Sequence, residues 1–147
     1  APFYNMEDGS VMTVFRYKEQ HQSYPGRVHG GMITAMLDEM GLRSLWAKEL
    51  SEETFGVTIS LDTKYRKPVP YETELIGRGV VVKNTSHFII TDSYIMDKDG
   101  EILANGRIKY IKMDTQKIQE GVEVHEEMPY LVEDGRTEIE GPFFDNL

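Results

Sequence analysis

The chain has 147 residues, the size of one domain, which excludes a two-domain enzyme. Hydrophobic residues make up 39% of it and charged residues 28%, so wholesale disorder and a coiled coil are also excluded. The absence of cysteine excludes disulfides, thiol catalysis and Cys-ligated zinc or iron–sulfur sites, and is compatible with the cytoplasmic location that we expect. We expect no membrane span, because every uncharged apolar run is far shorter than the roughly 20 residues that a span needs. We also expect no signal peptide, because the N-terminal residues have no basic start followed by an apolar core.

The net charge of −9 is concentrated in the last part of the chain. Residues 114–147 contain ten acidic and two basic residues, a balance of −8, which leaves residues 1–113 at −1. Phosphate neutralisation supplies most of the affinity of nucleic-acid-binding proteins, and this chain has no basic stripe with interleaved aromatic residues. We therefore expect no nucleic-acid partner.

One long helix is expected in the first third of the chain. Residues 11–17 have the pattern of a short strand, and a Pro-Gly turn and the pair Gly30-Gly31 follow, where a helix begins. Residues 32–50 contain no proline, and apolar residues recur there at helical spacing: Met32, Ile33, Met36, Leu37, Met40 and Ala47. The opposite side is apolar through Leu42, Leu45 and Trp46. A helix that is apolar nearly all round is usually buried, so we expect a sheet to wrap around it.

Four strands are expected after this helix, because the pattern changes to alternation. The alternating stretches cover residues 56–67, 72–84, 86–97 and 101–113. Short connections, including the turn DKDG before the last stretch, favour antiparallel neighbours. The layout predicts an α+β domain over residues 1–113, with an antiparallel sheet curled around one helix. Residues 114–147 show no sustained period, so we expect a partly irregular acidic tail.

Two adjacent acidic residues in the expected helix have different surroundings. Glu39 has Arg43 four residues further on, the favourable orientation of a helical ion pair, and is explained as structure. Asp38 has an apolar flank and no cation at helical spacing, so its placement is costly unless it faces a cleft, meets a partner from elsewhere or is functional. On its own, a solvated or cross-chain-paired Asp38 is the simpler interpretation.

The pair Gly30-Gly31 places unpaired backbone N–H groups at the positive end of the expected helix. Such an end can hold an anion or an oxyanion, and glycine allows a bulky group to approach the backbone closely. A plain tight turn explains the same two residues equally well.

Taken together, these residues resemble a known family. The strings HGGMITAMLDEMG, GVTISLDTKYRKPVP and DKDGEILANGRIKY occur in the order found in hotdog-fold acyl-CoA thioesterases of the phenylacetic-acid-pathway type, over about residues 20–113. The resemblance is strongest to their thioesterase-superfamily relatives that carry the motif PG-x-x-HGG. The resemblance implies a hotdog fold, a homodimer as the minimum unit with a homotetramer left open, and no cofactor beyond the coenzyme A of the substrate. It carries His29, Gly30 and Asp38 onto active-site positions, and Thr58 onto a strand threonine implicated in some members. Some members have an asparagine where this chain has Ser23, which leaves the orienting group unassigned.

The spacing within the helix bears on assembly. From Gly30 to Asp38 the helix rises about 12 Å, at about 1.5 Å per residue. An amide that stabilises an oxyanion and a carboxylate that attacks the adjoining carbon have to be much closer than that. We therefore expect Gly30 of one subunit and Asp38 of another to share each site, with the two helices side by side in opposite directions.

The remaining candidate groups each have two interpretations. His29 contacts the thioester oxygen or caps the turn by bonding to the backbone. Arg66 and Lys67, with Lys64 nearby, bind the phosphates of coenzyme A or face solvent at a strand end. The other histidines have no spacing that builds a metal site, so we expect no metal.

The favoured hypothesis is an acyl-CoA thioesterase. In it, Asp38 attacks the thioester carbonyl or activates a water, and the Gly30 amide receives the oxyanion. One alternative is a non-catalytic acyl-CoA-binding regulatory module on the same fold, which does not need Asp38. Another is an enoyl-thioester hydratase, whose motif is absent. The acyl group, the choice between coenzyme A and an acyl-carrier protein, and the pathway are not readable from the sequence.

Overall fold

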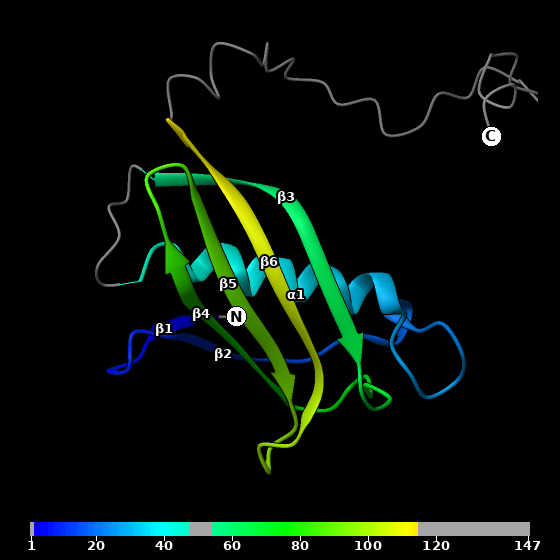
Figure 1. Cartoon of the computed structure of the whole chain (residues 1–147). Helices are drawn as coiled ribbons and strands as arrows, with labels where there is room; N and C mark the ends of the chain where they lie inside the picture. Colours follow the sequence, from blue (N-terminus) through cyan, green and yellow to red (C-terminus); the bar gives the residue numbers. More distant parts are fainter. Residues whose placement is uncertain (1, 48–53, 115–147) are drawn as a thin grey trace, which may run out of the picture.

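The computed structural model describes residues 2–47 and 54–114 of the chain, and Figure 1 shows its helices and strands. Strands β1 and β2 and a short 3-10 turn, η1, precede the helix α1, and four longer strands follow it. Their bounds are β1 Phe3–Asn5, β2 Val11–Phe15, η1 Glu19–His21, α1 Gly30–Ser44, β3 Thr54–Tyr65, β4 Leu75–Asn84, β5 Phe88–Met96 and β6 Ile102–Asp114. The predicted helix start at Gly30 and the predicted strands are thereby confirmed.

All six strands form one antiparallel sheet in the order β1-β2-β4-β5-β6-β3. The expectation that the four long strands are antiparallel neighbours is confirmed for β4 with β5 and for β5 with β6. It is wrong for β3 with β4, because β3 pairs with β6, whereas β4 pairs with β2. Alternation specifies the face that each side chain occupies, but not which strand lies next to it. The connection between β3 and β4 therefore has to pass two strands, β6 and β5, before the chain enters β4. Strand β3 lies at one edge of the sheet.

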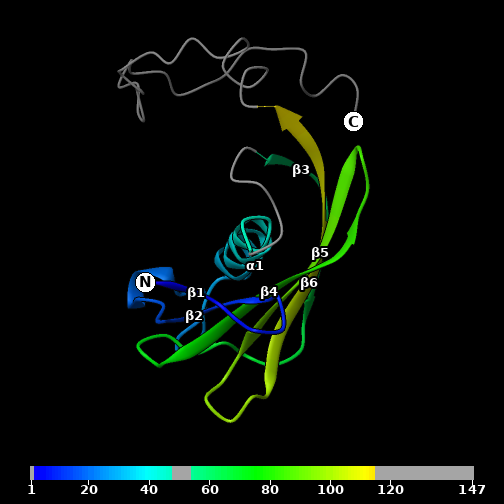
Figure 2. The same ribbon diagram turned by 90° about the vertical axis from the view of Figure 1, so that its left-hand side faces the viewer.

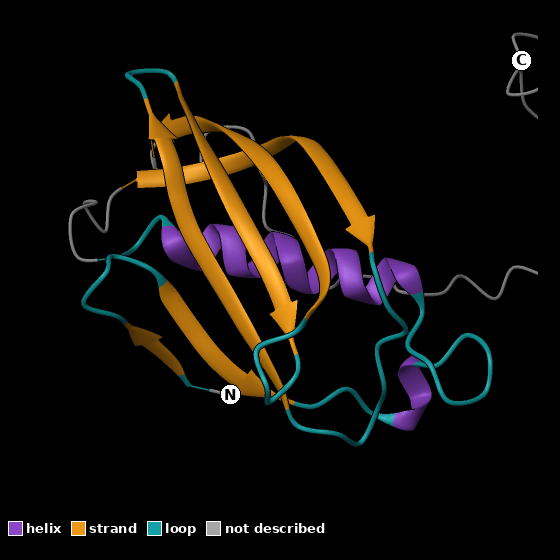
Figure 3. Cartoon of the chain, turned by 60° about the horizontal axis from the view of Figure 1, so that its bottom comes forward, coloured by secondary structure: helices purple, strands orange, loops and turns teal. Residues whose placement is uncertain are grey.

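The sheet curves around α1, which lies across its concave face (Figure 2). Figure 3 shows the same arrangement from below, with the helix spanning the long strands and η1 close to its start. Helix residues Ile33, Leu37 and Met40 are buried, and so are the inward residues of β5 and β6, which include Ile89, Ile95, Ile108 and Tyr110. This confirms the predicted helix wrapped by a sheet.

One side of the helix stays open, so the expected burial all round is wrong for the single chain. Met32 in the first turn of α1 is 37% exposed, and Trp46, just beyond the end of the helix, is 38% exposed. The helix is also shorter than the proline-free stretch allowed. Leu45, Trp46 and Ala47 donate their N–H groups to carbonyls three residues back, which tightens the chain into a turn after Ser44.

Two glycines let the helix and the sheet approach closely. A Cβ atom at Gly79 of β4 would lie 2.1 Å from the Met40 carbonyl oxygen, so any side chain there would push the two backbones apart. At Gly41 of α1, a Cβ atom would lie 2.3 Å from the Tyr110 hydroxyl oxygen of β6. These contacts hold the second half of α1, which carries Asp38, against the middle of the sheet.

The described chain ends in β6 at Asp114, one residue beyond the expected boundary of the domain. The expected irregular tail lies, apart from that residue, outside the described residues, as do residues 48–53. Strand β1 was not predicted, because three residues are too few to show a pattern.

Among the described residues, no helix has both the length and the apolar character needed to cross a membrane.

Candidate active site

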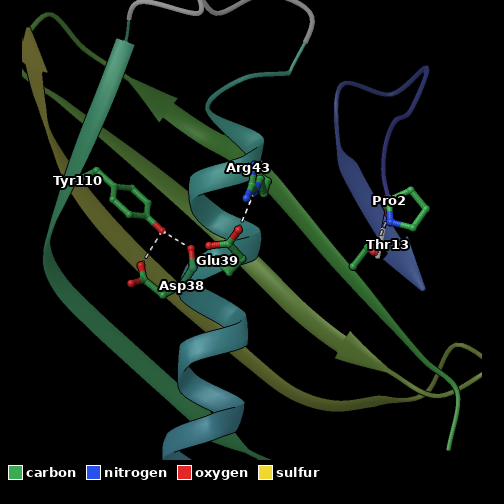
Figure 4. Close-up of polar contacts among 6 residues, drawn as sticks. All are labelled: Pro2, Thr13, Asp38, Glu39, Arg43 and Tyr110. Atoms are coloured by element: carbon green, nitrogen blue, oxygen red, sulfur yellow. Dashed lines mark hydrogen bonds and ion pairs between the residues drawn. The ribbon is translucent and has the colours of Figure 1, made fainter. Parts of the chain in front are cut away.

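Asp38 lies in the middle of α1 and meets partners from two strands. The Thr58 hydroxyl on β3 donates to its carboxylate, at 3.0 Å from Oδ1 and 3.3 Å from Oδ2. The Tyr110 hydroxyl on β6 lies 2.9 Å from Oδ1 and 3.0 Å from the Asp38 carbonyl oxygen (Figure 4). Within residues 2–47 and 54–114, no basic side chain forms an ion pair with Asp38. One of the possibilities predicted for Asp38 was a partner from elsewhere in the chain. The structure provides two such partners, Thr58 and Tyr110, and both are neutral hydroxyls.

Glu39 has the structural role predicted for it. Its carboxylate accepts from the Arg43 guanidinium at 2.6 Å, one helical turn further on, and Figure 4 shows this pair pointing away from Asp38. Arg43 also stacks over the rings of Phe3 and Trp46, at 4.8 and 5.1 Å from their centroids. Adjacent carboxylates thus face different environments, one a surface ion pair and the other a hydroxyl-lined contact with the sheet.

Tyr110 is a site residue that the sequence did not reveal. Its side chain is fully buried, and burial together with the nearby Asp38 carboxylate raises the pKa of its phenol well above the ordinary value of 10.0. The hydroxyl is therefore protonated at neutral pH and serves as a donor. Alternation along β6 predicts that Tyr110 faces the helix. Its contact with Asp38 depends in addition on where α1 lies across the sheet, which the alternation does not specify.

The start of α1 is capped by His29. Its Nδ1 accepts the Gly31 N–H at 2.9 Å, and its ring is exposed. This is the capping interpretation of His29. It leaves the Gly30 N–H as the first donor of the helix, and this group has no acceptor among the described residues.

Tyr65, at the end of β3, covers the same helix start. Its hydroxyl donates to the Gly30 carbonyl oxygen at 3.0 Å and lies 2.7 Å from the Thr34 hydroxyl, which in turn donates to Thr63 at 3.3 Å. A row of hydroxyl contacts thus runs along the seam between α1 and β3, from Gly30 at one end to Asp38 at the other. Tyr65 is 56% exposed, so this end of the seam is open to solvent.

The two predicted phosphate ligands lie just beyond Tyr65, and both are exposed. Arg66 donates through Nε to the Asn105 side chain at 2.5 Å, and Lys67 forms an ion pair with Glu101. Both contacts tie the end of β3 to the β6 side of the sheet. Among the described residues, no group of three side chains is able to hold a metal ion. The absence of a metal stays a prediction.

The sequence matches the thioesterase superfamily over residues 25–104, from the turn before α1 into β6. This match covers more than half of the chain. The chain belongs to the thioesterase superfamily. The predicted hotdog fold and the predicted class of enzyme, a thioester hydrolase, are thereby confirmed.

Individual relatives of this superfamily member agree with that placement. It is 23% identical to acyl-coenzyme A thioesterase 13 of Homo sapiens over 100 residues, which is 67% of this chain and 70% of that protein. It is 25% identical to acyl-coenzyme A thioesterase THEM4 of Rattus norvegicus over 118 residues, 80% of this chain, and spans about half the length of that protein, 49%. The BH2602 protein from Bacillus halodurans, solved with CoA, shares the fold with a TM-score of 0.66 at 21% identity, over 78% of this chain and 74% of that one.

Proposed function

We propose that this superfamily member hydrolyses an acyl-CoA thioester to a free acid and coenzyme A, with Asp38 as the reacting carboxylate. The observation that carries the proposal is the setting of Asp38, a partly exposed anion in mid-helix that two hydroxyls hold and no described cation neutralises. The names of the human and rat relatives, and the CoA in the Bacillus halodurans structure, support coenzyme A as the thiol half of the substrate.

Two routes are open to Asp38, and both consume one water. In the first, a carboxylate oxygen bonds to the thioester carbonyl carbon, the C–S bond breaks, CoA leaves as the thiolate, and water then hydrolyses the mixed anhydride. In the second, Asp38 takes a proton from a water as that water attacks the carbonyl carbon, and the proton passes to the departing sulfur. Either route ends with one acid and one thiol.

The start of α1 is proposed to stabilise the oxyanion. The Gly30 N–H carries the positive end of the helix dipole and is free of the His29 cap, which takes the next N–H instead. Tyr65 holds the Gly30 carbonyl oxygen, and this contact fixes the Gly30–Gly31 peptide, which directly follows the peptide that carries the Gly30 N–H. His29 is accordingly a helix cap in this proposal, and it contributes by orienting the amides beside the thioester.

The site is proposed to form between two copies of the chain that pair through β3. This strand is at the edge of the sheet and exposes Val57 and Ile59 by 44% and 49%. A long edge strand that has no proline and exposes apolar side chains is a template for pairing with another strand. A homodimer extends the sheet across this edge and covers both residues.

The contacts of β3 indicate the register of that pairing. Thr58 contacts Asp38, whereas Tyr65, seven residues further along the strand, contacts Gly30. The proposed reacting carboxylate and the proposed oxyanion donor therefore lie next to different parts of β3. Antiparallel pairing about a twofold axis near Asp62 brings Thr58 of one subunit close to the partner's Tyr65, since the register shift between Thr58 and Ser60 keeps both side chains on the helix side of the sheet. Asp38 of one chain then faces the helix start of the other, as the separation of about 12 Å within one helix requires.

Arg66 and Lys67 are proposed to bind the phosphates of coenzyme A, because they follow Tyr65 at the open end of the seam. Arg66 uses only Nε in its contact with Asn105, so its terminal nitrogens are free of that bond and suit a phosphate. Lys67 has to exchange Glu101 for the phosphate, so its contribution is the smaller of the two.

A panel of acyl-CoA substrates tests the proposed function, with aryl, short, medium and long acyl groups and free-thiol release as the readout. The proposal predicts turnover of at least one class well above the rate without protein. Saturable binding of acyl-CoA without thiol release would instead identify the alternative, a regulatory module that binds the substrate without catalysis.

A further inference from the structure

The two oxygens of the Asp38 carboxylate have unequal contacts. Oδ1 accepts from Tyr110 at 2.9 Å and from Thr58 at 3.0 Å, whereas Oδ2 has only the longer contact of 3.3 Å with Thr58. A carboxylate oxygen that accepts two hydroxyls is held in place and has its charge partly stabilised. Oδ2 is therefore the oxygen that is available to react.

The Tyr110 hydroxyl can reach Asp38 because α1 has a glycine one turn away. A Cβ atom at Gly41 would lie 2.3 Å from that hydroxyl oxygen and 2.7 Å from the Thr91 hydroxyl oxygen. Glycine in the interior of a helix destabilises it relative to alanine, so Gly41 weakens the helix locally but makes room for a close contact with the sheet. The space that it leaves is the space that the phenol occupies.

From this geometry we infer that Tyr110 is a positioning residue of the active site, which fixes Asp38 Oδ1 and directs Oδ2 at the thioester or at the attacking water. The inference rests on the proposed thioesterase function and adds a residue to it. Tyr110 lies beyond residues 25–104, over which the superfamily matches, so that match says nothing about its role. Its full burial keeps it from touching the substrate, and it acts through Asp38.

The variant Tyr110→Phe tests the inference, with Tyr17→Phe as its matched control. Tyr17 is also buried, 5% exposed, and its hydroxyl also donates to the backbone of α1, to the Met32 carbonyl oxygen at 3.2 Å. Each change removes one buried hydroxyl that donates to the backbone of the helix, but only the Tyr110 hydroxyl also donates to the Asp38 carboxylate. We expect Tyr110→Phe to lower kcat about tenfold or more with KM within about threefold, and Tyr17→Phe to keep kcat within about twofold.

A second variant acts on the same contact from the helix. Gly41→Ala keeps the tyrosine but displaces its hydroxyl, so we expect kcat to fall by a similar factor with little change in KM. In the double variant the phenol oxygen, the atom closest to the new methyl group, is gone, and of the two close oxygens only that of Thr91 remains. Adding Gly41→Ala to Tyr110→Phe should therefore lower kcat little further. Gly41→Ala alone carries the test if Tyr110→Phe does not fold.

Wild type and Asp38→Asn are measured in the same series. If both are equally inactive on every acyl-CoA tried, the proposed function fails and this inference falls with it. If wild type is active and Asp38→Asn is not, the function stands, and equal kcat values for Tyr110→Phe and Tyr17→Phe would overturn the role of Tyr110 alone. For a Tyr110→Phe variant that does not fold, a Gly41→Ala protein with full kcat overturns it.

Discussion

Two inactive variants of this chain should restore activity to each other when they are mixed. Gly30→Val places a branched side chain where even a Cβ atom would lie 3.3 Å from the Tyr65 hydroxyl oxygen, so the substrate loses access to the Gly30 amide. Asp38→Asn keeps the shape of the carboxylate but can neither attack nor take a proton. In the proposed homodimer, each variant on its own should therefore be nearly inactive.

The size of the recovery follows from counting sites. In a mixed dimer, one site combines the normal Gly30 of one chain with the normal Asp38 of the other, while the second site carries both defects. Random re-pairing of equal amounts makes about half of the dimers mixed, and each has one sound site of two. Activity should therefore recover to about a quarter of the wild-type value if the sites act independently.

The assay is thiol release after the two variants are mildly denatured and refolded together, with exchange of subunits verified by mass. Each variant refolded alone is the control for recovery that does not depend on mixing. A mixture that stays inactive although mixed dimers are present would refute the shared site, because a site contained within one chain cannot be complemented.

Three further measurements follow from the structure. Because the chain has no cysteine, Asp62→Cys should cross-link two subunits under mild oxidation, and a protein that stays monomeric under denaturing, non-reducing conditions would contradict the proposed axis. Truncation after residue 114, where β6 ends, should leave a folded dimer, whereas loss of soluble dimer would make the tail part of the fold. Asp8 accepts hydrogen bonds from Ser10 and Arg78 that lower its pKa from 3.8 to about 2, so its contribution to stability is present above pH 3.8 and is lost as the pH falls towards 2. A carboxyl-carbon NMR titration midpoint near 3.8 would show that these bonds do not hold in solution.

The parts of the fold that depend on local pattern could be predicted from the sequence. Alternation marked the long strands, and the Gly30-Gly31 pair marked the helix start. The pairing of β3 with β6 could not be predicted, because period-two alternation is the same whichever strand lies alongside. The short connection between β3 and β4 favoured direct pairing of these two strands, but β5 and β6 lie between them in the sheet.

In the candidate site, too, local features could be predicted from the sequence and long-range contacts could not. The contrast between Glu39 and Asp38 was visible because an ion pair at four-residue spacing is a local property of a helix. Tyr110 was not visible, because its contact with Asp38 spans 72 residues and depends on the close approach of α1 at Gly41. The cap formed by His29 was one of two open interpretations, and only the position of its Nδ1 distinguishes them.

The central claim, that Asp38 performs the hydrolysis, is tested most directly by comparing Asp38→Asn with Glu39→Gln on the best acyl-CoA of the panel. The two changes remove one charge each at adjacent helix positions, so effects on net charge and helix content are matched. We predict that Asp38→Asn loses more than nine-tenths of kcat, with acyl-CoA binding within a few-fold, while Glu39→Gln keeps turnover nearly unchanged because an exposed helical pair contributes only about 0.2–0.5 kcal/mol to stability. An Asp38→Asn protein that retains more than about a tenth of wild-type kcat, or a Glu39→Gln protein that is inactive while Asp38→Asn is not, would contradict the assignment.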